Sequence, residues 1–150
     1  MHTKSKQGQT HLKSNDLAPS LAPNNYVFCS LPGAQYGDFA QTQPLACIAE
    51  AEGLTLVLAQ DQADAEGLTY TGIFRCISLG LHSSLDAVGL TAMISSELAQ
   101  HGISANMIAG YHHDHLLVPA AQAHQALNLL EQLSTERRGN DALSRAGSNP

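Results

Sequence analysis

The hydrophobic and polar positions in the first half of the chain predict three strands and a short helix. Residues 26–31 are β-branched, aromatic and apolar, which is typical of a strand, whereas residues 34–44 have no clear period and are expected to form a loop. Residues 45–51 and 54–59 are two more apolar runs on either side of a Glu-Gly pair, which predicts a hairpin. A short helix over residues 62–66 is expected to follow.

The second half begins with a predicted strand over residues 73–81 and continues into a helix. Ser83 and Asp86 fit the S-x-x-D capping pattern, so we expect the helix to begin at Ser83. His101 and Gly102 are typical of its end. Apolar residues at helical spacing give this helix one buried stripe: Ala87, Leu90, Ile94 and Leu98.

A second hairpin and a last helix complete the pattern. Residues 103–109 alternate between apolar and polar, which predicts a strand with one buried face. Residues 110–114 turn the chain, residues 115–118 return, and Pro119 ends the strand and opens the last helix. The apolar side of that helix is formed by Ala123, Ala126, Leu127, Leu130 and Leu133.

The predicted elements fall into two halves between polar ends. Residues 1–25 are expected to be a disordered N-terminal arm and residues 135–150 a flexible tail. Residues 26–71 and 72–134 share the order strand, connection, strand, turn, strand, helix, which indicates a weak internal duplication. The expected fold class is α+β, with an antiparallel sheet covered by helices on one face.

Charge is distributed unevenly and excludes some partners. A content of 43% hydrophobic and 13% charged residues is typical of a globular chain. Between residues 20 and 134 there are ten acidic residues and one basic residue, Arg75, so this body carries a charge of −9. It repels phosphate backbones, which argues against nucleic acid, and it tolerates a cationic ligand. No apolar run approaches the roughly 20 residues of a membrane helix, so no membrane partner is expected.

The cysteines and the N-terminus favour a cytoplasmic protein. Cys29, Cys47 and Cys76 are odd in number and form no C-x-x-C pair, which predicts reduced thiols. The lysines near the N-terminus are not followed by an apolar stretch, so the start of the chain does not have the pattern of a secretory signal.

Three blocks of sequence carry a family resemblance: EAEGLTLVL at residues 50–58, HSSLDAVGLTA at 82–92 and GISANMIAGYHHDHLLVP at 102–119. With them the chain resembles ACT-domain proteins over residues 26–134. The similarity is strongest to small bacterial ACT proteins and weaker to cytosolic arginine sensors and aspartate kinase regulatory domains. The resemblance implies a ferredoxin-like ACT fold with two ACT-like halves. It also implies side-by-side pairing of ACT sheets and an effector, an amino acid, bound at the interface.

The resemblance also implies that the loop after a first strand and the facing hairpin hold the ligand. The residues agree with this use, because the N–H groups of a helix start favour an α-carboxylate, and Gly89 permits close approach. The carbonyls of the Gly110 turn suit an α-ammonium, and Asp114 matches an acidic hairpin position of the arginine sensors, whereas His112 and His113 differ from that pattern. The expected ligand-binding residues are His82, Ser83, Ser84, Leu85, Asp86, Val88, Gly89, Ala109, Gly110, Tyr111 and Asp114.

An alternative reading uses the histidines of the second hairpin. In an extended chain only two of these histidines, His113 and His115, share one face. Zinc takes three or four ligands, so this pair alone is too few for a zinc site. A metal-binding or hydrolytic protein built on residues 112–115 and a purely structural dimer therefore remain alternatives. The sequence contains no G-x-S-x-G, Walker or G-x-G-x-x-G motif, so we expect no catalytic residue, no cofactor and no bound metal. The hypothesis is a non-catalytic sensor that binds an amino acid and forms a homodimer or higher homo-oligomer.

Overall fold

The computed structural model describes residues 16–82, 86 and 88–147 and has an α+β fold, as expected. Six strands form one antiparallel sheet in the order β2-β3-β1-β4-β6-β5. The strands are β1 (Pro19–Leu31), β2 (Ala46–Glu50), β3 (Gly53–Ala59), β4 (Phe74–Leu79), β5 (Asn106–Ala109) and β6 (Asp114–Pro119). The helices are α1 (Gln60–Ala65), α2 (Leu90–Gln100) and α3 (Ala123–Ala146), with 3-10 turns η1 (Ala40–Thr42) and η2 (Ala120–Gln122). Both predicted hairpins are confirmed.

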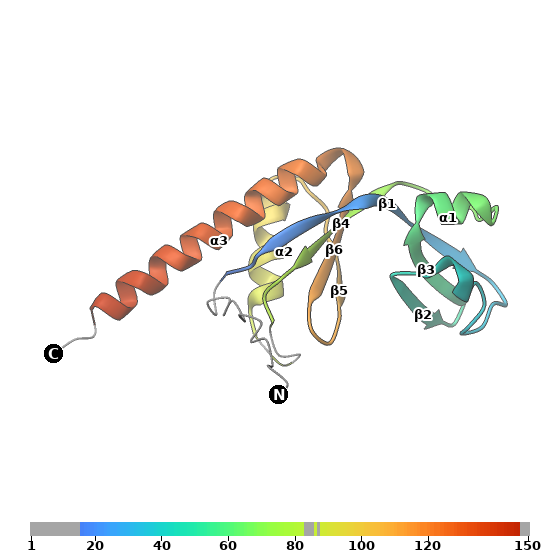
Figure 1. The fold of residues 1–150 in the computed structure, drawn as a ribbon, viewed down its shortest axis with the longest axis horizontal. Coiled ribbons are helices and arrows are strands. Elements are labelled where there is room, and N and C mark those ends of the chain that lie inside the picture. The colour runs from blue at the N-terminus through green and yellow to red at the C-terminus, as the bar shows by residue number, and fades with distance from the viewer. Residues whose placement is uncertain (1–15, 83–85, 87, 148–150) are drawn as a thin grey trace, which may run out of the picture.

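The long strand β1 belongs to both halves of the molecule. Residues 19–26 run along β4 and residues 26–31 run along β3, with a register shift between Leu21 and Asn25. Proline is tolerated in a sheet at such an irregularity, and Pro23 lies within it. In Figure 1, β1 crosses from the side of α2 and α3 to the side of α1, β2 and β3. The two halves are therefore joined through β1 and β4 into one continuous sheet.

The three helices cover the same face of this sheet. Tyr26 lies opposite Phe74 in the register, so Val27, one residue after Tyr26, and Ile77, three residues after Phe74, both point to the other face. Val27 is buried in the cluster that includes Ala63 of α1, and Ile77 is buried in the cluster under α2 and α3. Each fully buried Leu or Ile in these clusters contributes about 1.5–3 kcal/mol to folding.

The opposite face carries no helix among the described residues, yet part of it is apolar. Val57, Cys76 and Leu117 are almost fully buried at its centre. Phe28 and Phe74 pack beside them edge to face, with ring centroids 5.2 Å apart. Burial of Cys76 raises the pKa of its thiol, and the three cysteines are free, as expected.

The N-terminal arm expected up to residue 25 is wrong for its last ten residues. Strand β1 begins at Pro19, and Leu17 is fully buried against α3 and β4. The N–H of Leu17 donates to Ser134 Oγ over 2.9 Å. This part of the strand is ordered by β4, more than 50 residues away in the sequence, and not by a local apolar run.

The flexible tail expected over residues 135–150 is wrong for residues 135–146, because α3 continues to Ala146, and residues 148–150 lie outside the described part of the chain. Its last turns extend beyond the sheet in Figure 1, and Leu143 there is 74% exposed. The segment is polar, but seven of the twelve residues at 135–146 are Glu, Arg, Leu or Ala, which are good helix formers. Arg137 Nη1 donates to Met93 Sδ over 3.7 Å and Arg138 pairs with Asp16 over 3.5 Å, so the first turns of this extension still contact the rest of the protein. No helix in the described part of the chain is both long and apolar enough to cross a membrane.

Candidate functional site

The segment that follows β4 and the tip of the β5–β6 hairpin lie together. His82 follows β4, and its Nδ1 lies 3.1 Å from the carbonyl oxygen of His112, so the Nδ1–H donates to that oxygen. The His82 ring is 5.4 Å from the ring of His112 and 6.4 Å from that of His113. Two segments separated by 30 residues are therefore in contact at this end of the sheet.

The hairpin tip is a tight turn that depends on Gly110. The Gly110 N–H donates to the carbonyl oxygen of His113 over 2.9 Å and closes a loop of two residues, Tyr111 and His112. A Cβ at position 110 would lie 2.7 Å from that same oxygen, closer than real Cβ contacts. Tyr111 is 73% exposed, so its phenol ring projects from the tip into solvent.

Asp114 begins β6 directly opposite Ala109 of β5. Residues opposite each other in an antiparallel pair share one face, so the carboxylate and the exposed Ala109 lie side by side. Asp114 is half-buried and is the only acidic residue of the hairpin, which contains no lysine or arginine. Around neutral pH this edge therefore attracts a cation.

The segment that leads into α2 differs from the prediction. Ser83, Ser84, Leu85 and Ala87 lie outside the described residues, and α2 begins at Leu90, not at the expected Ser83 cap. Gly89 is the residue before the helix and has φ +95°, a left-handed conformation that suits glycine and that a helix interior does not allow. The expectation of a helix from Ser83, with Gly89 in its interior, is therefore wrong. Asp86 and Val88 are exposed, Val88 to 98%.

This later start changes which backbone groups are available to a ligand. The first N–H that bonds back within α2 is that of Met93, which donates to the carbonyl of Gly89 over 3.0 Å. The N–H groups of residues 90–92 precede it and have no acceptor within the helix. They point toward the helix N-terminus, where the dipole favours a negative charge.

The histidines separate into two environments. His115 lies on the helix-free face, and its Nδ1 is 2.7 Å from Ser78 Oγ. Burial, with a smaller contribution from His113, lowers the pKa of His115 from its ordinary value of 6.5. Within the described residues, no group of three or more His, Cys, Asp or Glu side chains is placed to hold a metal ion.

The sequence prediction missed the residues that fix the end of β4. The Gly80 N–H donates to the carbonyl of Ala18 over 2.9 Å, and the Leu81 N–H donates to the carbonyl of Leu17 over 3.3 Å. A Cβ at position 80 would lie 2.9 Å from the Cβ of Ala18, so glycine permits this close approach. The apolar Leu17 in a polar segment was the only available signal.

Comparisons with known proteins agree with this architecture. Family models described as ACT domain match residues 11–75 and residues 72–132. A crystal structure of a Vibrio cholerae protein of unknown function, described as a possible transport protein, is 48% identical, with a TM-score of 0.72; the match covers 78% of this chain and 88% of that one.

Two more distant structures share the fold. A protein from Agrobacterium tumefaciens is 18% identical, with a TM-score of 0.64, over 77% of this chain and 87% of that one. The regulatory subunit of aspartate kinase from Thermus flavus is 11% identical, with a TM-score of 0.59, over 79% and 97% of the two chains. The comparison with curated proteins gave no match.

Proposed function

Because the chain belongs to the ACT-domain proteins and contains two ACT domains, we propose that it is a non-catalytic regulatory protein that binds an amino acid beside the β5–β6 hairpin. ACT domains are typically regulatory modules that bind small ligands. The observation that supports this site is the contact between His82 and His112, which joins the segment after β4 to the hairpin. The free cysteines support a cytoplasmic location.

The two ends of the site suit the two charges of an amino acid. The N–H groups at the start of α2 favour the α-carboxylate, and the segment of residues 82–89 leads up to them. The carbonyls of Ala109 and Gly110 suit the α-ammonium, and Asp114 supplies a counter-charge for a basic side chain. The arrangement therefore favours a cationic amino acid.

A second copy of the chain is needed if this site lies between two ACT domains. The strand order places β5 at one edge of the sheet and the N-terminal half toward the other edge, so the two domains of one chain do not meet at this hairpin. Gly110 and His113 form a hydrogen-bonded pair at the end of the hairpin. Hydrogen-bonded and non-hydrogen-bonded pairs alternate along an antiparallel ladder, so the next pair, Ala109 and Asp114, is not hydrogen-bonded and the N–H of Ala109 faces the free edge of the sheet. We propose a homodimer in which β5 pairs with β5 of a second copy.

A thermal-shift screen with the twenty amino acids tests the binding proposal. A ligand at 100 times its Kd adds about 2.7 kcal/mol to the free energy of unfolding, which a melting curve detects. We expect at least one basic amino acid to raise Tm, and Asp114→Asn to weaken its binding by about tenfold. Glu52→Gln, in the exposed turn of the β2–β3 hairpin, is the matched control. A screen in which no amino acid raises Tm would refute the proposal.

The molecular mass in solution tests the homodimer. Light scattering is expected to give twice the 15.9 kDa of one chain. Ala109→Pro removes the N–H that faces the free edge and should yield a monomer, whereas Ala49→Pro on the opposite edge strand β2 should remain dimeric. A wild-type monomer, or a dimer insensitive to Ala109→Pro, contradicts pairing through β5.

A further inference from the structure

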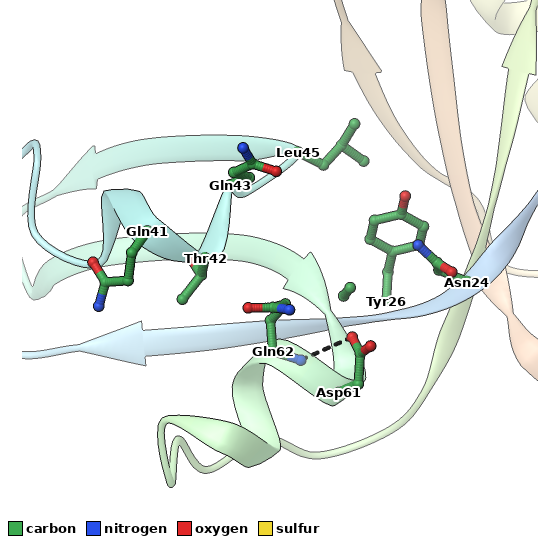
Figure 2. A pocket seen from close by; sticks show the side chains of 9 residues that line it. Asn24, Tyr26, Gln41, Thr42, Gln43, Leu45, Asp61 and Gln62 are labelled. Carbon is green, nitrogen blue, oxygen red and sulfur yellow. Dashed lines mark hydrogen bonds between the residues drawn. The ribbon is translucent and has the colours of Figure 1, made fainter.

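A hollow lies in the N-terminal half, away from the β5–β6 hairpin. It has a volume of about 330 Å³ and lies where the second part of β1 begins, β3 ends and α1 starts. Figure 2 shows Tyr26 and Asn24 of β1 on one side, Gln43 on another, and Asp61 and Gln62 of α1 below. The volume is at the small end of the range for ligand pockets, about 300–1,000 Å³.

Uncharged polar groups form most of the wall. Asn24, Gln43 and Gln62 present side-chain amides, each of which can both donate and accept hydrogen bonds. The Gln41 amide lies at the rim and donates to Glu66 Oε1 over 3.3 Å. Burial raises the pKa of Tyr26, so its phenol stays protonated around neutral pH and can donate as well. Such a wall matches a ligand that carries several hydroxyl or amide groups.

One charge distinguishes this pocket. Asp61 is the only acidic or basic residue among the described residues that line it. Its Oδ1 accepts the N–H of Gln62 over 2.8 Å, the dashed line in Figure 2, which leaves Oδ2 available. The only arginine between residues 20 and 134, Arg75, is engaged elsewhere, because its guanidinium donates to the carbonyl oxygen of Ala22 over 2.7 Å.

We propose that this pocket binds a small polyhydroxylated or amide-bearing molecule with a single ammonium group, and that Asp61 is the counter-ion of that group. Asp61 attracts the ammonium, and the amide side chains take up the remaining donors and acceptors of the ligand. The site is independent of amino-acid binding at the β5–β6 hairpin, because it shares no residue with that hairpin or with the segment before α2.

Backbone NMR titrations with two pairs of probes test the proposal. Glucosamine is compared with glucose, and 2-amino-1,3-propanediol with glycerol, so each pair differs by its ammonium group. We expect the ammonium probes to shift the amide signals of residues 24–26, 41–43, 45 and 59–62, and to bind at least tenfold more tightly than their neutral partners. Equal binding within both pairs, or no shift in these signals with any probe, overturns the proposal.

Two variants locate the site. Asp61→Asn keeps an oxygen acceptor for the Gln62 N–H and removes the charge, so it should weaken glucosamine binding by at least tenfold. Ala59→Leu fills part of the hollow and should abolish binding. Asp114→Asn is the control and should leave glucosamine binding unchanged. Unchanged glucosamine binding in Asp61→Asn overturns the proposal even if Ala59→Leu does not fold.

Discussion

Ser134 links α3 to the start of β1, and its replacement by alanine gives a sharp test of the fold around the candidate site. The side chain is 1% exposed. Its Oγ accepts the N–H of Leu17 over 2.9 Å and donates to Asp16 Oδ1 over 2.8 Å. Because Leu17 and Ala18 in turn accept the N–H groups of residues 81 and 80, this link helps to position His82.

The expected loss of stability follows from the group left without a partner. In Ser134→Ala the buried N–H of Leu17 loses its acceptor, which costs about 1–3 kcal/mol. Asp16 also loses a donor, but its carboxylate is partly exposed and can turn to water, so it adds little. We therefore expect the free energy of unfolding to fall by about 1–3 kcal/mol.

Urea unfolding followed by circular dichroism measures this difference. Thr135→Ala is the matched control on the next residue of α3, since its exposed hydroxyl donates only to the carbonyl of Glu131; it should change stability by less than about 0.5 kcal/mol. If Ser134→Ala loses no more than Thr135→Ala, the link between α3 and β1 does not stabilise the protein and the reasoning is wrong.

The same variant has a pH signature. The hydrogen bond from Ser134 is the largest cause that lowers the pKa of Asp16 below its ordinary value of 3.8. A lowered pKa stabilises the fold above the unfolded-state pKa, and this contribution is lost as the pH falls through the folded-state value. Ser134→Ala should therefore lose less stability than the wild type as the pH falls from about 5 to about 2.

Three further predictions concern the core, the hairpin and its histidine. Leu130→Ala removes a fully buried side chain of α3 and should cost about 2–5 kcal/mol in urea unfolding, whereas Leu143→Ala, 74% exposed on the same helix, should cost less than about 0.5 kcal/mol. Gly110→Ala drives a Cβ against the backbone oxygen of His113 and should lower Tm and weaken amino-acid binding together. The lowered pKa of His115 predicts that stability falls as the pH drops below 6.5, and His115→Gln should flatten this dependence.

Local patterns were sufficient where the chain folds on itself. The alternation around Met107, the Gly110 turn and the stop at Pro119 predict the second hairpin and the last helix, and the structure confirms both. Each of these signals acts within a few residues, so the sequence displays them directly.

The elements that were mispredicted depend on distant or backbone effects. The first part of β1 is ordered by β4, which no local pattern around Pro19 indicates. Gly89 delays α2 through its left-handed conformation, which overrides the capping pattern at Ser83. The pocket at Asp61 is lined by residues from three separate segments: 24–26 of β1, 41–45 before β2, and 59–62 at the end of β3 and the start of α1. Its amide side chains do not form a sequence motif. These contacts between distant segments can be predicted only when the strand order is known.

A crystal structure of the protein grown with the amino acid that raises its Tm most would test the central claim most directly. The proposal predicts the α-carboxylate at the start of α2, the α-ammonium against the carbonyls of Ala109 and Gly110, and a second copy alongside β5. An amino acid bound anywhere else on the chain, or a β5 edge left free in the complex, would contradict it.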